Sequence, residues 1–314
     1  MEKSFKCRLP IYESNPIGLG CWALGGRNWG GQSEKAAFEV METALESGIR
    51  HFDTARVYGV SEKLVGSFLK ESRSEVFLAS KVYPTGSKAQ VKESLQRSLD
   101  ALQTDYIDLF YLHWPVRDGD NVESMEALME ARQAGLIGAI GVSNYSLPDL
   151  EMIVQTGPVD FLQAGYHLLW RSIEEGILPF CRKNGIRVVA YSSLGQGILT
   201  GKFPRNPEFP KGDHRANHVL HFRKDVWPDV YETVEELKGV AASAGRQLAH
   251  LALQWVAARE GITSLLVGAR KAGQVVENAG ALKDPVDSAI LDALTRISDA
   301  LDARLPSAQT IFGK

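Results

Sequence analysis

Eight short apolar runs, each followed by a segment with helical spacing, constrain the fold of this chain more than any other feature. The runs cover residues 16–20, 49–53, 75–81, 106–112, 136–142, 159–166, 186–192 and 263–269. Strands that are buried on both faces of a parallel sheet read as continuous apolar runs of this kind. Eight such units without a domain linker favour a closed (β/α)8 TIM barrel over an open doubly wound sheet. We therefore predict an α/β fold with a single barrel domain over residues 1–314.

The segments between the runs predict the helices around the barrel. Apolar residues recur at helical spacing, as in the set Leu64, Val65, Phe68 and Leu69. Ser87 and Ser172 are placed to cap the third and sixth helices, and an amphipathic stretch at 287–302 predicts an extra C-terminal helix. Residues 202–227 are polar, contain prolines and lack periodicity. Because they follow the seventh strand, on the face where a barrel holds its site, we expect them to form a flap.

Composition excludes several kinds of partner. The net charge of -3, from 38 acidic and 35 basic residues, leaves no basic excess for nucleic acid. No apolar stretch approaches the length of a membrane span, and the N-terminal residues lack the apolar core of a secretion signal. Cys7, Cys21 and Cys181 form neither a disulfide framework nor a metal-ligand pattern. We expect a cytoplasmic protein without a metal, with Cys21 as a small apolar filler.

Four ionisable residues follow the early strands and predict a reactive site. Asp53 and Tyr58 come after the second run, Lys81 ends the third and His113 follows the fourth. The C-terminal ends of barrel strands meet on one face, where barrel enzymes hold their sites. Taken singly, these residues could be a turn cap, a loop aromatic, a surface lysine and a structural histidine. Their occurrence together at consecutive strand ends favours a site.

The same four residues suggest carbonyl chemistry. A positioned tyrosine can give a proton to a carbonyl oxygen, and we expect Lys81 to lower the pKa of Tyr58 by stabilising its phenolate. Asp53 would hold Lys81 charged, and His113 would bind and orient the substrate oxygen. The pattern therefore predicts a tuned acid for reducing an aldehyde or ketone.

The chain resembles the aldo-keto reductases, particularly the bacterial members related to potassium-channel β subunits. The resemblance lies in GLGCWALGG at 18–26, HFDTARVYG at 51–59, IGVSNYS at 140–146, YSSLGQGILTGK at 191–202, and GAR with ENAG within 268–280. It implies a TIM barrel with a short N-terminal hairpin, and a catalytic tetrad of Asp53, Tyr58, Lys81 and His113. It also implies an NAD(P)H-dependent oxidoreductase.

The dinucleotide would be bound by barrel loops, since the glycines of the chain do not fit the spacing GxGxxG. The resemblance implies that Tyr191 stacks on the nicotinamide and that Ser143, Asn144 and Gln163 bind its carboxamide. By spacing alone, Ser143 and Asn144 could instead cap the following helix. Arg270 could grip a 2′-phosphate, which favours NADPH over NADH, although a solvated arginine is the simpler reading of that residue alone. The remaining implied cofactor residues are Gly20, Trp22, Ser192, Ser193, Leu194, Gly197, Lys202, Gly268, Gln274, Glu277 and Asn278.

An aromatic substrate wall is predicted from Trp22, Trp29, Tyr83 and Trp114, each of which could equally be core packing. Two positions depart from the family pattern. Ser193 stands where proline is usual, and the pair Tyr166-His167 replaces Tyr-Asn.

Three functions remain open from the sequence. The leading one is an NADPH-dependent aldehyde or ketone reductase acting on a small-molecule carbonyl substrate. A second is a cofactor-binding regulatory subunit with vestigial reductase activity, which would also keep the tetrad. A metal-dependent barrel hydrolase is disfavoured because the HxH ligand pair after an early strand is missing. The sequence carries no readable signal for the substrate or the oligomeric state.

Overall fold

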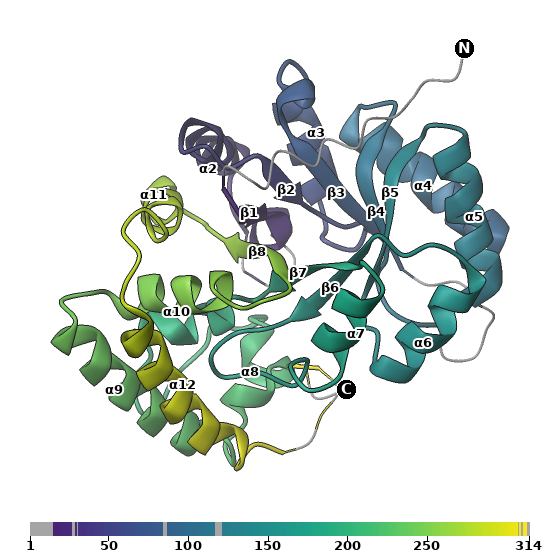
Figure 1. The fold of residues 1–314 in the computed structure, drawn as a ribbon. Coiled ribbons are helices and arrows are strands. Elements are labelled where there is room, and N and C mark those ends of the chain that lie inside the picture. The colour runs from purple at the N-terminus through teal and green to yellow at the C-terminus, as the bar shows by residue number, and fades with distance from the viewer. Residues whose placement is uncertain are drawn as a thin grey trace.

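The chain folds into a closed barrel of eight parallel strands (Figure 1). The computed structural model describes residues 15–26, 29, 31–83, 87–116, 121–306, 308 and 310–312. The strands are β1 (Ile17–Gly20), β2 (His51–Asp53), β3 (Phe77–Val82), β4 (Ile107–Leu112), β5 (Ile137–Ser143), β6 (Phe161–Gly165), β7 (Arg187–Tyr191) and β8 (Ile262–Gly268). They pair in sequence order, and β8 closes onto β1. The predicted TIM barrel is confirmed, whereas the predicted N-terminal hairpin lies outside the described residues.

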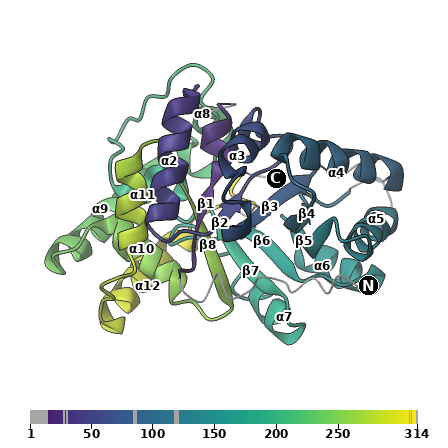
Figure 2. The same cartoon turned by 90° about the horizontal axis from the view of Figure 1, so that it is seen from above.

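Helices surround the strands. They are α2 (Glu34–Glu46), α3 (Ser61–Leu69), α4 (Lys88–Leu102), α5 (Asn121–Gln133), α6 (Leu147–Thr156), α7 (Ile177–Lys183), α8 (Arg215–His218), α9 (Trp227–Ser243), α10 (Leu248–Ala257), α11 (Ala272–Gly280) and α12 (Ser288–Asp302). Figure 2 shows α2 and α11 side by side, flanking β1 and β8. The predicted C-terminal helix is α12, which lies with α9 and α10 on one side of the barrel (Figure 1).

The two predicted serine caps have different outcomes. Ser87 occupies the N-cap position of α4, although its side chain makes no capping hydrogen bond. The prediction for Ser172 is wrong, because α7 begins at Ile177 after Gly176. Turns occupy residues 172–176, so the helix begins five residues after Ser172.

The barrel interior is filled by side chains that alternate along the strands. Phe77, Ala79, Leu109, Tyr111, Ala139, Phe161, Val189 and Leu266 form this inner cluster. Gly141 makes room for Tyr111, because a Cβ atom at that position would lie 2.3 Å from the tyrosine ring. These side chains fill the barrel beneath the C-terminal ends of the strands, and those ends form the open face.

An ion pair between the buried Asp108 and the partly buried Arg73 joins two strands at the opposite end of the barrel. The carboxylate of Asp108, at the start of β4, accepts hydrogen bonds from Arg73 Nη2 at 2.7 Å and from the backbone N–H of Leu78 at 2.9 Å. These contacts join β3 and β4 near their N-terminal ends. Lys81 and His113 lie at the other end of these strands, so the pair of Asp108 and Arg73 has a structural role.

The segment after β7 is more ordered than its sequence predicted. It contains α8 and a short 3-10 helix, Leu220–Phe222. Phe222 packs against Phe203, Phe209 and Trp227 with ring centroids 4.7 to 5.0 Å apart. These aromatic contacts hold the segment against the open face. They follow no helical or strand periodicity, so the sequence pattern does not predict them. Within the described residues, no helix combines the length and apolar character needed to cross a bilayer.

Candidate active site

The four predicted ionisable residues meet at the open face of the barrel. Asp53 is the last residue of β2, Lys81 lies near the end of β3, and His113 directly follows β4. Lys81 Nζ donates hydrogen bonds to Asp53 Oδ1 at 2.5 Å and to the carbonyl of Thr54 at 2.8 Å. Gln163 Nε2 binds the other oxygen of Asp53 at 2.8 Å. The ion pair is thus anchored from three strands.

Tyr58 reaches this ion pair from the loop between β2 and α3. Its ring centroid lies 5.0 Å from Lys81 Nζ and 5.8 Å from the ring of His113. Trp22 stacks on the other side at 5.7 Å. Gly25 permits this arrangement, because a Cβ atom there would come 1.7 Å from the carbonyl oxygen of Tyr58. The tyrosine is therefore held between the cation, the histidine and the segment after β1.

Burial acts against both members of the ion pair. It raises the pKa of Asp53, an effect that Lys81 and the hydrogen bonds from Lys81 and Gln163 oppose. It lowers the pKa of Lys81, and Asp53 opposes that shift. Lys81 is fully buried and Asp53 nearly so. Each charge therefore depends on the other, which makes the pair sensitive to loss of either partner.

The pKa of Tyr58 differs from the expectation drawn from the sequence. Burial raises the pKa of Tyr58 well above its usual value, and the nearby Asp53 raises it further. The expected lowering by Lys81 is outweighed, because the phenolate would form in a poorly solvated site beside a carboxylate. Burial also lowers the pKa of His113 well below its usual value, with a further contribution from Lys81. At neutral pH the site therefore presents a protonated tyrosine and a neutral imidazole.

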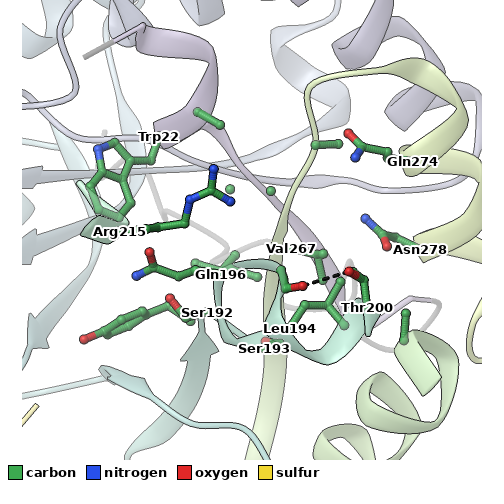
Figure 3. A pocket seen from close by; sticks show the side chains of 18 of the residues that line it. Trp22, Ser192, Ser193, Leu194, Gln196, Thr200, Arg215, Val267, Gln274 and Asn278 are labelled. Atoms are coloured by element: carbon green, nitrogen blue, oxygen red, sulfur yellow. Dashed lines mark hydrogen bonds between the residues drawn. The ribbon is translucent and has the colours of Figure 1, made fainter. Parts of the chain in front are cut away.

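These residues open onto a cavity of about 1240 Å³. Every site residue predicted from the sequence lines it except Lys81, which lies beneath the surface. The volume exceeds the roughly 300 to 1,000 Å³ of a typical small-ligand pocket. Figure 3 shows the cavity running from Trp22 past Ser192 and Leu194 to Gln274 and Asn278. An elongated cavity of this size has room for a dinucleotide together with a small substrate.

Ser143, Asn144, Gln163 and Tyr191 come together at the inner end of the cavity, next to the tetrad. Asn144 Nδ2 donates to the carbonyl of His113 at 3.0 Å, and Tyr191 donates its hydroxyl proton to Asn144 Oδ1 at 2.7 Å. The alternative of a helix cap is resolved by Ser146, which forms the capping box of α6 with Asp149. Ser143 and Asn144 therefore do not cap α6, and they line the cavity instead.

The loop after β7 presents backbone and a lysine to the middle of the cavity. Ser192, Gly195, Gln196 and Gly197 all have positive φ angles, between 54° and 96°. The N–H groups of Gly195 and Gly197 donate to the carbonyls of Ser192 and Leu194 within the loop. Turns of this kind can direct the remaining N–H groups toward an anion. Lys202 Nζ lies 3.3 Å from the position of a Cβ atom on Gly197, and burial lowers the pKa of this lysine. Ser193 keeps a buried place in this loop, with its hydroxyl 3.5 Å from the carbonyl of Ala190.

The outer end of the cavity lies at the N-terminus of α11. Gln274, Glu277 and Asn278 project from this helix, and Gly268 and Arg270 precede it. Gln274 Oε1 accepts a hydrogen bond from the backbone N–H of Arg270 at 2.9 Å. The guanidinium of Arg270 donates to the carbonyl of Gly31 at 2.9 Å. A helix N-terminus with an adjacent arginine is a favourable place for a phosphate group.

The predicted aromatic wall is present, and two further segments complete it. Trp22, Trp29, Tyr83 and Trp114 line the cavity, with Tyr83 at its exposed rim. His214, from the segment after β7, lies 4.6 Å from both Trp22 and Trp29 between ring centroids. Phe312, near the C-terminus, stacks at 6.3 Å on Tyr191 and also contacts Trp22 and Trp114.

Several lining residues carried no signal in the sequence. Arg215 is held by Asp213 at 2.6 Å and lies over the ring of Trp29, and Gln196 binds His214 at 2.5 Å. These contacts depend on how the segment after β7 folds back over the site, and neither spacing nor composition predicts that path. Further lining residues are Ala23, Val57, Thr200, His218, Lys238, Ala241, Ala242, Arg246, Gln247, Leu248, Ala249, His250, Leu266, Val267 and Ala269.

Comparisons with known proteins agree with this geometry. A sequence model of the Aldo/keto reductase family matches residues 16–299. The chain is 38% identical to aldo-keto reductase YhdN of Bacillus subtilis over 84% of this chain and 83% of that protein. It is 32% identical to the NADH-specific methylglyoxal reductase of Escherichia coli, over 91% and 95% of the two chains. The solved structure of a glycerol dehydrogenase from Gluconobacter oxydans matches with a TM-score of 0.81 at 31% identity, covering 92% of both chains. The likeness therefore extends over the whole barrel.

Proposed function

Because this chain belongs to the aldo/keto reductase family, we propose that it reduces an aldehyde or ketone to the alcohol with NADPH as its cofactor. Members of this family are NAD(P)H-dependent oxidoreductases that act on carbonyl groups. The observation that carries the proposal is the cluster of Tyr58, Lys81, Asp53 and His113 at the inner end of a cavity whose volume, about 1240 Å³, can hold a dinucleotide.

The residues around the cavity fit a nicotinamide cofactor. The backbone of the loop after β7 suits a pyrophosphate, and the groups at the start of α11 suit an adenosine phosphate. Tyr191 offers an aromatic face beside Ser143, Asn144 and Gln163, whose polar groups can bind a carboxamide. When bound there, the reduced nicotinamide would supply the hydride that carbonyl reduction requires.

Tyr58 acts as the proton donor in this reaction. Its raised pKa keeps the hydroxyl protonated until negative charge develops on the carbonyl oxygen. As that oxygen takes the proton, the electron pair of the O–H bond stays on Tyr58, and the phenolate is stabilised by Lys81. His113, neutral at pH 7, binds the carbonyl oxygen and orients it toward Tyr58. The tyrosine then recovers a proton from water.

We propose NADPH over NADH because of Arg270. The guanidinium lies at the outer end of the cavity beside the N-terminus of α11, where a 2′-phosphate would gain both a cation and helix N–H groups. The relative from Escherichia coli is named as NADH-specific, so the two nucleotides must be compared directly. We further propose that the chain forms one barrel domain in the cytoplasm. The buried free thiols of Cys21 and Cys181 are compatible with a reducing compartment.

The test is the rate of NADPH and NADH oxidation with a panel of aldehydes, short sugars and dicarbonyl compounds. We expect steady-state turnover with NADPH on part of the panel. Tyr58→Phe should reduce kcat by about 10² to 10⁴, with NADPH affinity within about twofold and near-normal stability, because only the proton donor is removed. If Tyr58→Phe kept most of the rate, Tyr58 would not be the proton donor. If the wild type bound NADPH without multiple turnovers, a cofactor-binding regulatory role would replace this proposal.

A further inference from the structure

The carboxylate of Glu62 is buried on the outer side of the barrel wall, behind the strand that carries Lys81. Glu62 lies in the first turn of α3 and is only 2% exposed. Successive side chains of a strand point to opposite faces, so Ser80 points outward where Lys81 points into the barrel. Ser80 Oγ donates a hydrogen bond to Glu62 Oε1 at 2.7 Å. A buried acidic side chain thus backs the strand at the level of the active site.

The second oxygen of Glu62 binds the loop that carries Tyr58. Arg56 Nη1 donates to Glu62 Oε2 at 3.2 Å, and Arg56 stands two residues before Tyr58. The backbone N–H of Arg56 also donates to the carbonyl of Lys81 at 3.4 Å. Glu62 therefore joins the loop of the proton donor to the strand of its cation, from outside the barrel.

We propose that Glu62 is a positioning residue for the proton donor, which holds the loop of Tyr58 against the end of β3. On the inner face, Lys81 already binds the start of this loop through the carbonyl of Thr54. Glu62 supplies the matching connection on the outer face, so the loop is attached to β3 on both sides. The inference rests on the proposed function, because it assigns a role in placing the acid of that reaction.

The energetics favour a role beyond packing. Burying a carboxylate is costly, and a buried ion pair adds little net stability compared with apolar residues of the same size. Here the arginine partner is partly solvent-exposed, with 37% of its side chain accessible, which weakens the pair further. Catalysis, in contrast, is sensitive to displacement of a reacting group by about 1 Å, which can cost about a hundredfold in rate.

The charge of Glu62 also reaches the tetrad. Burial lowers the pKa of Lys81, Asp53 opposes that shift most strongly, and Glu62 opposes it as well. Removal of the negative charge should therefore let Lys81 lose its proton at a lower pH. This gives a readout that a purely structural residue would not move.

Asp108, on β4, provides a matched control that binds the same strand, β3. Like Glu62, it is a buried carboxylate that binds an arginine and β3, but it does so at the N-terminal end of the barrel. We compare Glu62→Gln with Asp108→Asn, measuring kcat, KM, NADPH affinity, the pH profile of kcat and the thermal midpoint. For Glu62→Gln we expect kcat to fall about ten- to a hundredfold, with NADPH affinity within about twofold of the wild type. The decline of kcat at high pH, the basic limb of the pH profile, should shift to lower pH. For Asp108→Asn we expect a lower midpoint with kcat and pH profile close to wild type.

Variants of Arg56 test the proposal if Glu62→Gln does not fold. Arg56→Gln removes the partly exposed partner and should lower kcat in the same direction, and Arg56→Lys should restore part of it. If Glu62→Gln and Arg56→Gln fold but keep wild-type kcat and pH profile, Glu62 has no positioning role. The proposal is also overturned if Asp108→Asn lowers kcat and shifts the basic limb as much as Glu62→Gln. Loss of activity in Tyr58→Phe alongside unchanged Glu62→Gln would reject this inference while leaving the proposed function intact.

Discussion

Replacement of Lys81 by methionine should destabilise the fold as well as abolish turnover. The variant keeps an unbranched side chain that is one atom shorter, and removes the hydrogen bonds to Asp53 Oδ1 at 2.5 Å and to the carbonyl of Thr54 at 2.8 Å. Among the residues that the structure describes, Asp53 would keep only the donor of Gln163. Breaking a buried ion pair on one side leaves an uncompensated charge, which costs about 3 to 5 kcal/mol.

This cost corresponds to a measurable change in melting temperature. With about 2.1 cal/mol/K per residue, a chain of 314 residues has an unfolding entropy of about 0.66 kcal/mol/K. A loss of about 3 to 5 kcal/mol then lowers the midpoint by roughly 5 to 8 °C, if unfolding is reversible. The measurement is calorimetry of the purified variant beside the wild type, with the rate of carbonyl reduction measured on the same samples.

The defect should depend on pH in a defined direction. Burial already raises the pKa of Asp53 in the wild type, and loss of Lys81 removes the main effect that opposes this rise. A raised carboxyl pKa means that the folded state holds the proton to higher pH than the unfolded state, so the penalty is complete only above the folded pKa. The difference in midpoint should therefore shrink as the pH falls through the raised pKa of Asp53.

Two further variants make the argument refutable. Adding Asp53→Asn to Lys81→Met removes the stranded charge and should recover most of the lost stability without recovering activity. Lys88→Met removes a lysine of α4 that is partly exposed and paired with Glu126 and Glu130, and should leave the thermal midpoint close to that of the wild type. A Lys81→Met midpoint equal to that of the wild type, or a double variant less stable than the single one, would show that the pair does not carry buried charge.

Two other substitutions test the cofactor end and the placement of the proton donor. Arg270→Ala should raise the Kd for NADPH about tenfold to a hundredfold, as expected from losing a charge-assisted contact of about 1.5 to 3 kcal/mol, and leave that for NADH nearly unchanged. Fluorescence titration with both nucleotides decides this, and equal losses would make Arg270 structural. Gly25→Ala should lower kcat about tenfold or more, because the added methyl group would lie 1.7 Å from the carbonyl oxygen of Tyr58. Kinetics beside Gly239→Ala, where nothing lies within 4 Å of the added atom, would contradict this if both variants kept the wild-type rate.

The segment after β7 shows where sequence reasoning met its limit. Its prolines and polar residues predicted an irregular flap, and it does reach the cavity through His214 and Arg215. Its order comes from Phe203, Phe209 and Phe222, which meet through contacts between rings that follow no helical or strand period. Phe312 is a similar case, because it reaches Tyr191 only through the course of the C-terminal segment over the barrel.

The pKa values illustrate a second limit. Sequence order placed Tyr58 and Lys81 at neighbouring strand ends, which correctly predicted their proximity. It could not rank the cation against desolvation and the carboxylate of Asp53, since those effects depend on how much water remains around the phenol. In the folded chain the effect of burial is larger, so the pKa of Tyr58 is higher than the sequence suggested.

The eight strands, their closure into a barrel and the meeting of Asp53, Tyr58, Lys81 and His113 at its open face could be predicted from the sequence. A strand buried on both faces leaves a continuous apolar run, and the C-terminal ends of barrel strands share one face. The groups that surround these four residues could be identified only from the packing of the folded chain. Glu62 reads in the sequence as an ordinary acidic residue in the first turn of a helix, yet packing of α3 against β3 buries it between Ser80 and Arg56. Periodicity reports which face of an element is buried, whereas the partners of a buried charge depend on how separate elements pack in space.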